Sequence, residues 1–277
     1  MPLQARRLIR KMRGGAQSHL LEADDGHCYV VKFKNNPQHC RVLVNEMIAG
    51  VFLRYLQIST PDMAILKISE EFLAANPEVF IRLGDRRQPV EPGWHFGSRF
   101  PGDPNQVAVY DFLPDVLLSK VVNLPEFLGV LAFDKWTANA DSRQAIFFRA
   151  RLKNWTPASE VHPLKMGFLA LMLDHGYIFD GPHWTFVDSP LHGLYYRPMV
   201  YANVTSWNDF QPWLDRIRYF PEEVVDRACR QVPPEWLAGE EAQLEALVNR
   251  LLDRRKRVAD LIDDCRRGPA NLFPNWK

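Results

Sequence analysis

The sequence lacks any excess of charge of one sign. Its 34 lysines and arginines face 33 aspartates and glutamates, which leaves a net charge of +1. Proteins that bind nucleic acids or membrane surfaces often carry a clear positive excess, and this composition gives no such signal. No apolar run approaches the ~20 residues that a membrane-spanning helix needs. The basic start MPLQARRLIRKMRGG also lacks the apolar stretch of a signal peptide. We therefore expect a cytoplasmic protein with no membrane partner.

Cysteine and glycine are scarce as well. The four cysteines form no C-x-x-C pair and lie near no histidine pair at zinc-ligand spacing, so they predict thiols in a reducing compartment. The 15 glycines are outnumbered by 21 prolines, which favours loop-rich α+β structure over a simple helical bundle. What the chain does have is apolar material. Of its 277 residues, 47% are hydrophobic, which is enough to bury a sizeable core and excludes disorder as the main state.

The first part of the chain predicts strands and a single helix. Residues 7–35 hold three apolar stretches separated by a glycine turn and by an Asp-Gly step, which is a strong hairpin signal. Over residues 42–56 apolar side chains recur at helical spacing, which predicts an amphipathic helix. Residues 60–105 alternate prolines with short apolar runs and predict irregular, β-rich structure. A compact β-like run over residues 106–114 ends this part.

The second part predicts mainly helices. A helix over residues 126–136 has apolar side chains all round, which indicates burial on most sides. Residues 169–179 predict a buried strand, a glycine turn and a second strand. Residues 208–267 show helical spacing almost throughout and stop at a glycine. The character of the chain therefore changes near residues 110–116, from a β-rich half to a helix-rich half.

Two features of the first part point to phosphate chemistry. A glycine turn lies between the first two strands and consists of Gly14, Gly15, Ala16, Gln17 and Ser18. Glycine lets backbone N–H groups approach phosphate oxygens closely, although such turns also occur without a ligand. The second feature is Lys32 inside an apolar strand, where a buried ammonium needs a partner, and Glu46 on the following helix is a candidate. The alternative for Lys32 is an outward position at a strand edge.

Two features of the second part are acidic. Asp141 follows the buried helix in a polar loop, where a carboxylate can accept a proton from a hydroxyl group. Asp174 ends an apolar strand before a glycine turn, a good position for holding Mg²⁺ against phosphates. Taken singly, the two are also compatible with a capped helix end and a plain aspartate turn. The order of glycine turn, strand lysine, helix glutamate, loop aspartate and strand-end aspartate is that of a two-lobed kinase.

With these residues the sequence resembles the bacterial HipA-like kinase family, in its short form with a single kinase domain. The resemblance spans most of residues 10–200. It rests on the segments GGAQSHLLEADDGHCYVVKFK (14–34), NEMIAGVFLRYLQISTP (45–61), GWHFGSRF (93–100), FDKWTANADSRQ (133–144) and MLDHGYIF (172–179). It implies an α+β, bilobal protein-kinase-like fold with a β-rich N-lobe that has one helix and a mainly helical C-lobe. The N-lobe would comprise residues 1–112 and the C-lobe residues 113–277.

The resemblance also implies roles for the site residues. The glycine turn would cover the phosphates of ATP, with Lys32 as the phosphate-binding lysine and Glu46 as its ion-pair partner. Asp141 would be the catalytic base and Asp174 the ligand of Mg²⁺, while Asp134 is expected to be structural. The adenine-binding hinge would consist of Val109, Tyr110, Asp111 and Phe112.

One position departs from the pattern of the family. The family usually reads N-x-D-R-x-x-x-N, and its final Asn, five residues after the Asp, holds metal. Here Ile146 stands at that position, and Arg143 is shifted by one. Because isoleucine cannot coordinate Mg²⁺, the expected substitute is Gln144 or Asn139.

The resemblance implies ATP- and Mg²⁺-dependent phosphate transfer to a Ser or Thr hydroxyl of a protein. ATP, a protein substrate and an antitoxin-like protein are the implied partners. The residue at position 146 leaves open a nucleotide-binding pseudokinase that serves as an interaction module. A small-molecule or lipid kinase is the third alternative, since related folds act on such acceptors.

Overall fold

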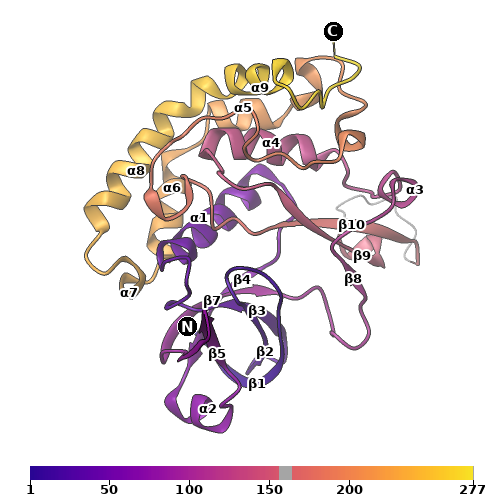
Figure 1. The fold of residues 1–277 in the computed structure, drawn as a ribbon. Coiled ribbons are helices and arrows are strands. Elements are labelled where there is room, and N and C mark those ends of the chain that lie inside the picture. Colours follow the sequence, from indigo (N-terminus) through magenta and orange to yellow (C-terminus); the bar gives the residue numbers. More distant parts are fainter. Residues whose placement is uncertain (156–163, 277) are drawn as a thin grey trace.

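A closed β-barrel forms from strands of the first part of the chain (Figure 1). The computed structural model describes residues 1–155 and 164–276. The strand order around the barrel is β1-β2-β3-β7-β4, closed by the parallel pair of β1 and β4. The antiparallel pairs β1–β2 and β2–β3 confirm the strands predicted for residues 7–35. The barrel strands are β1 (Leu3–Lys11), β2 (His19–Ala23), β3 (Cys28–Lys32), β4 (Met63–Ile68) and β7 (Gly93–Arg99).

Helix α1 (Arg41–Leu56) is buried on nearly all sides. The apolar spacing predicted this helix correctly, but the expectation that it is amphipathic is wrong. Its side chains belong to the same hydrophobic core as those of the helices of the second part, and β7 of the barrel lies against it as well. Figure 1 shows α1 at the lower edge of the helical part, above the barrel. One hydrophobic core thus spans both sides of residue 112. The division of the chain into two lobes after this residue stays a prediction.

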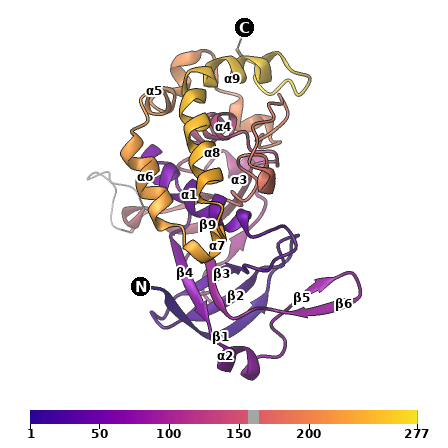
Figure 2. The same ribbon diagram turned by 90° about the vertical axis from the view of Figure 1, so that its left-hand side faces the viewer.

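A second helix and a hairpin lie between the barrel strands β4 and β7. Helix α2 (Glu70–Ala75) begins at Ser69, whose Oγ accepts the backbone N–H of Phe72 at 3.1 Å. Strands β5 (Phe80–Leu83) and β6 (Arg86–Pro89) form a hairpin that projects from the barrel in Figure 2. The prediction of a single helix before residue 113 is therefore wrong, because α2 is too short to give a periodic apolar signal.

The second part of the chain starts with a buried helix and a three-stranded sheet. Helix α4 (Glu126–Thr137) is buried along its length, as predicted. The sheet has the order β10-β9-β8. Residues 169–179 do not form the expected pair of strands: the strand ends at Leu173, and Asp174 and Phe179 have left-handed φ angles of +59° and +61°. The remaining elements here are α3 (Asp115–Leu118), β8 (Val109–Tyr110), β9 (Gln144–Arg151) and β10 (Met166–Leu173).

Five helices complete the fold, in agreement with the helical prediction for residues 208–267. They are α5 (Trp213–Arg218), α6 (Glu222–Gln231), α7 (Pro234–Leu237), α8 (Glu241–Arg254) and α9 (Val258–Arg267). Short 3₁₀ turns occupy Leu152–Asn154, Gly181–His183, Pro198–Tyr201, Trp207–Phe210 and Arg255–Arg257. Within the described ranges, no helix combines the length and the apolar character needed to cross a membrane.

Candidate active site

A cavity of about 670 Å³ lies between the barrel and the helical part. Its lining comes from β1, β3 and β7 of the barrel, from α1, and from the loops around β9 and β10. Four predicted residues far apart in the sequence line it together: Lys32, Glu46, Asp141 and Asp174. The fold therefore brings the charged residues that the sequence singled out into one cavity.

Lys32 makes two ion pairs at the centre of the cavity. Its Nζ donates to Glu46 Oε1 at 2.5 Å and to Asp174 Oδ1 at 2.7 Å. The lysine and glutamate side chains are 12% and 5% exposed, whereas that of Asp174 is 33% exposed. Lys32 thus points into the cavity, and the alternative of an outward position at a strand edge is wrong. Of the three, Asp174 is the residue that a ligand can reach most easily.

The charges of these three residues depend on one another. Burial alone would lower the pKa of the Lys32 ammonium, but the Glu46 and Asp174 carboxylates hold that pKa above its ordinary value. Burial alone would raise the pKa of Asp174, and Lys32 holds it below its ordinary value. For Glu46 the effect of burial exceeds the opposing effect of the Lys32 ammonium, so the pKa of this carboxyl is raised. The site therefore presents an ammonium and a charged carboxylate side by side, as a metal–phosphate ligand requires.

The backbone after β10 is held in an unusual conformation. Asp174 has a φ angle of +59°, which costs a residue other than glycine about 1 kcal/mol. Asn45, fully buried on α1, holds the segment that follows: its Nδ2 donates to the carbonyls of Gly176 at 2.7 Å and of Ile178 at 3.1 Å. Sequence reasoning missed Asn45, although a polar side chain beside Glu46 in an apolar helix was a usable signal.

A fully buried ion pair supports the loop that carries Asp141. Arg143 Nε donates to Asp134 Oδ2 at 2.8 Å, and its Nη2 donates to Asp134 Oδ1. Burial raises the pKa of Asp134, and Arg143 opposes that shift. A third nitrogen of the guanidinium, Nη1, donates to the carbonyl of Leu173 at 2.8 Å. Asp134 is therefore structural, as expected, and Arg143 ties the Asp141 loop to the residue before Asp174.

His175 links the same elements. Its backbone N–H donates to Glu46 Oε1 at 3.0 Å, and its ring Nδ1 lies 3.0 Å from Arg143 Nη1. Burial lowers the pKa of His175 well below the ordinary value, and Arg143 adds to that effect. Since Arg143 can only donate, Nδ1 accepts and Nε2 carries the proton toward the carbonyl of Met172 at 3.2 Å. His175 thus connects α1, the Asp141 loop and the end of β10 next to Asp174.

The loop around Asp141 is fixed by short-range hydrogen bonds. Asp141 Oδ1 accepts the N–H of Ser142 at 2.7 Å, and its own N–H donates to Asn139 Oδ1 at 3.2 Å. Asn139 is fully buried, and its Nδ2 donates to Asp134 Oδ1 at 3.0 Å. Both polar atoms of Asn139 are thereby occupied inside the protein. Asn139 is also not among the residues that line the cavity, so the structure does not place it as the substitute metal ligand.

Gly193 packs tightly against this loop. Its N–H donates to the carbonyl of Asp141 at 2.9 Å, its φ is +69°, and an added Cβ would lie 2.4 Å from Asp134 Cβ. We expect Gly193→Ala to lower the free energy of unfolding by about 2–4 kcal/mol, because it adds a backbone penalty and a clash in the core. Gly84→Ala is the matched control, since Gly84 has φ +59° with nothing within 4 Å of the added Cβ. That variant should lose only about 1 kcal/mol in urea unfolding. Equal losses in both variants would contradict the packing argument.

Only part of the predicted glycine turn faces the cavity. Gly14, Gly15, Ala16 and Ser18 line it, whereas Gln17 does not. The Gln17 side chain instead holds the β5–β6 hairpin: its Nε2 donates to the carbonyl of Arg82 at 2.6 Å, and its Oε1 accepts the N–H of Arg82 at 2.7 Å.

The predicted hinge also divides between the cavity and solvent. Val109 and Asp111 line the cavity. Tyr110 and Phe112 are 45% and 61% exposed outside it, and Arg197 lies over the Phe112 ring at 4.3 Å. The structure thus brings together two of the four hinge candidates.

Strand β9 begins immediately after the Asp141 loop and places Gln144 and Ile146 along the cavity. Gln144 pairs with Leu173 in the sheet, and a side-chain hydrogen bond from Gln144 helps to lower the pKa of Asp174. Ile146 offers the cavity only an apolar surface. Gln144 is therefore placed beside Asp174, as a second ligand would be. Thr60, Met63 and Phe96 also line the cavity. Thr60 and Phe96 lie in segments that carry the family resemblance, but none of the three was predicted as a site residue.

Three solved structures are similar to this chain. The crystal structure of the Golgi casein kinase superposes with a TM-score of 0.52 and 11% identity, over 97% of this chain and 74% of that one. A crystal structure of the Golgi casein kinase with Mn/ADP bound gives a TM-score of 0.49, 11% identity and the same coverage, 97% and 74%. The structure of hydra Fam20 with sugar gives 0.43 and 12% identity, over 97% of this chain and 86% of that one. The first of these likenesses shows a mixed α/β fold of kinase-like architecture.

Sequence comparison identifies the family. The comparison with curated proteins finds no match. The family model described as HipA-like kinase matches residues 6–147. This range covers more than half of the chain and includes the glycine turn, Lys32, Glu46 and Asp141. The chain belongs to the HipA-like kinase family.

Proposed function

We propose that this protein is an ATP- and Mg²⁺-dependent kinase that phosphorylates a Ser or Thr hydroxyl of a protein. The observation that carries the proposal is the contact of Lys32 with both Glu46 and Asp174, in a cavity that Asp141 also lines. In phosphoryl transfer a protein contributes mainly positioning and electrostatic stabilisation. An ammonium held beside two carboxylates, in a cavity that a glycine turn also lines, is suited to positioning a phosphate and stabilising its charge.

The residues present fit a nucleotide-bound Mg²⁺. Among the described residues, no group of three or more His, Cys, Asp or Glu side chains is arranged to hold a metal alone. Mg²⁺ in kinases takes one or two carboxylates and completes its octahedral shell with phosphates and water. Asp174 would supply the carboxylate and Gln144 an amide oxygen. The bound ion would neutralise charge on the transferring phosphate.

The remaining residues act on the nucleotide and the acceptor. Lys32 would bind phosphate oxygens, with Glu46 keeping the ammonium oriented after a nucleotide draws it away from Asp174. Backbone N–H groups of the glycine turn would cover the phosphates, and Val109 and Asp111 would border the adenine. The Asp141 carboxylate would accept the proton of the acceptor hydroxyl. The backbone N–H of Ser142 already holds this carboxylate in place.

The test combines binding and transfer measurements on the full chain. ATP with Mg²⁺ should raise Tm clearly more than ATP with EDTA, and radiolabelled ATP should transfer phosphate to a dephosphorylated casein probe or to the protein itself. Lys32→Met should weaken nucleotide binding, because the ammonium that meets the phosphates is lost. Absence of any Tm shift with ATP would contradict a nucleotide site.

A second candidate, a nucleotide-binding pseudokinase, is favoured by Ile146. This side chain lines the cavity where a metal-binding asparagine would stand in the family, and it offers no ligand atom. A pseudokinase would show stabilisation by ATP without dependence on Mg²⁺ and without transfer. The two measurements above therefore separate the candidates.

A further inference from the structure

The β5–β6 hairpin carries a cluster of like charges on one face. Arg82 and Arg87 are direct cross-strand partners, a pairing that destabilises a hairpin when both residues are cationic. Both guanidinium groups lie near the ring of Phe80, with carbons 5.9 and 4.6 Å from its centroid. Lys11, from the end of β1, places its Nζ 3.1 Å from the same centroid. We call Lys11, Phe80, Arg82 and Arg87 the basic hairpin surface.

The cations of this surface repel one another. Within the described part of the chain, neither Lys11 nor Arg82 nor Arg87 takes part in a salt bridge. Burial lowers the pKa of the Lys11 ammonium. The positive charges of Arg82 and Arg87 lower this pKa further, and the Glu78 carboxylate opposes them. An anion bound here would relieve this mutual repulsion.

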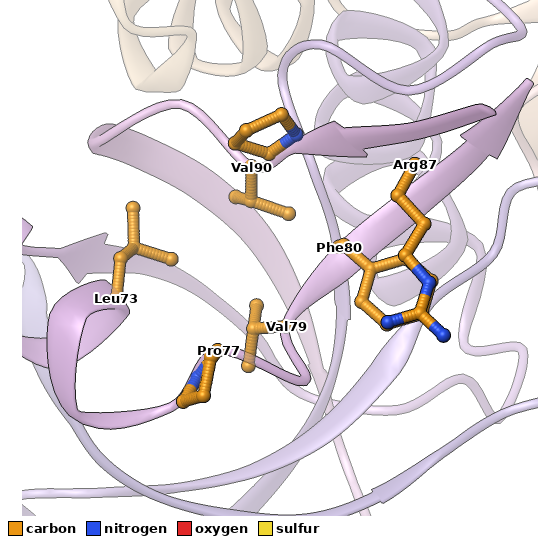
Figure 3. A pocket seen from close by; sticks show the side chains of 7 residues that line it. Leu73, Pro77, Val79, Phe80, Arg87 and Val90 are labelled. Atoms are coloured by element: carbon orange, nitrogen blue, oxygen red, sulfur yellow. The ribbon is translucent and has the colours of Figure 1, made fainter.

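An apolar pocket adjoins the cations. It has a volume of about 260 Å³. Figure 3 shows its side chains, which come from α2, from the segment that follows it and from the hairpin. Its lining is Leu73, Pro77, Val79, Phe80, Arg87, Pro89 and Val90. Phe80 and Arg87 belong both to this pocket and to the basic hairpin surface. A ligand that fits both features must combine negative charge with a small apolar group.

The surface has a fixed position relative to the candidate active site. The two hydrogen bonds between the Gln17 side chain and the Arg82 backbone hold the hairpin against the glycine turn. Lys11 lines the large cavity as well as facing Phe80. A segment bound to the hairpin would therefore run beside the mouth of the cavity.

We propose that the basic hairpin surface and its apolar pocket dock an acidic segment of the protein acceptor, with one aliphatic side chain inserted in the pocket. The assignment to an acceptor rests on the proposed function, whereas the binding itself does not. A nucleic acid would offer phosphates but no aliphatic group for the pocket, and the hairpin is too short to follow an extended phosphate backbone. An acidic peptide supplies both parts.

The test measures peptide binding by fluorescence anisotropy at low salt, with the full chain and no nucleotide. The probe is a fluorescein-labelled peptide Glu-Glu-Asp-Leu-Glu-Glu. The double variant Arg82→Glu/Arg87→Glu should weaken its binding by about tenfold or more, since two attractive charges become repulsive. Exchange of the leucine of the peptide for alanine should weaken binding to the wild type by about fivefold, because the pocket loses its apolar occupant.

Arg86→Glu is the matched control. Arg86 lies on the same hairpin, is exposed and pairs with Leu83, so Arg86→Glu reverses one charge of the hairpin away from Phe80, against two in the double variant. It should keep most of the affinity for the peptide. Binding within twofold of wild type in the double variant, an equal loss in Arg86→Glu, or tighter binding of a labelled oligothymidylate than of the peptide would each overturn the proposal.

Catalysis provides a separate readout. With a serine peptide flanked by the same acidic residues, the double variant should raise KM and leave kcat unchanged. The Tm shift caused by ATP with Mg²⁺ at physiological salt should remain as in wild type. If no phosphate transfer occurs at all while the binding pattern holds, the docking surface stands and the proposed kinase activity fails.

Discussion

Asp174→Asn is expected to lower the rate of phosphate transfer by about 10³-fold or more, because it removes the carboxylate that would hold the metal at the developing charge. Asparagine keeps the size of the side chain, and Lys32 keeps its contact with Glu46 at 2.5 Å, so the fold should persist. ATP should still raise Tm in this variant. The additional rise that Mg²⁺ gives in the wild type should disappear, and differential scanning fluorimetry with and without EDTA measures it.

Asp141→Asn is the matched control for that experiment. Asp141 lines the same cavity, and its Oδ1 accepts the neighbouring N–H of Ser142. Among the described residues it forms no ion pair with Lys32, whose partners are Glu46 and Asp174. Loss of a general base should lower the transfer rate by about 10²–10⁴-fold. The Mg²⁺-dependent Tm shift should survive in this variant. Turnover like wild type in Asp174→Asn would refute the metal role, and loss of the Mg²⁺ effect in Asp141→Asn would refute the division of roles.

The sequence was sufficient to find the charged centre of the site. Lys32, Glu46 and Asp174 are each unusual in an apolar element, and a buried charge requires a partner, so their meeting could be anticipated. Asp141 was recognisable because a polar loop directly follows a buried helix. What these residues do chemically stays a prediction.

Residues that hold the site in place were harder to predict. Arg143 meets Asp134 and the carbonyl of Leu173 through contacts that leave no periodic trace in the sequence. Gln17 looked like part of a phosphate-covering turn, but its side chain satisfies the backbone of Arg82. Such long-range partners depend on the tertiary arrangement, which local spacing does not encode.

The same limitation explains the errors in the fold. The burial of α1 on all sides depends on helices that come much later in the chain, such as α6 and α7, which pack against it. Helix α2 has only six residues, too few for a periodic signal, and depends on the cap from Ser69. Strand β10 was predicted to turn into another strand, but Asn45 binds the carbonyls of Gly176 and Ile178 and holds that segment as a series of turns.

The buried pair of Arg143 and Asp134 should have the largest effect on stability. Both side chains are 0% exposed, so Asp134→Asn leaves a guanidinium buried without its counter-charge. Removal of one partner of a buried pair costs about 3–5 kcal/mol, and we expect a loss of this size in the free energy of unfolding by urea. Asp115→Asn is the control, because Asp115 pairs with Arg197 at the surface and is 67% exposed. It should cost less than about 1 kcal/mol.

A double variant separates the two roles of this pair. In Asp134→Leu/Arg143→Met neither charge is left buried, so part of the lost stability should return relative to Asp134→Asn. The double variant nevertheless lacks Arg143 Nη1, which donates to the carbonyl of Leu173 and to Nδ1 of His175. It therefore also lacks the link between the Asp141 loop and Asp174. Phosphate transfer should therefore stay low while stability recovers. If activity returns together with stability, Arg143 serves the fold alone. If stability returns without activity, Arg143 is a positioning residue for the site.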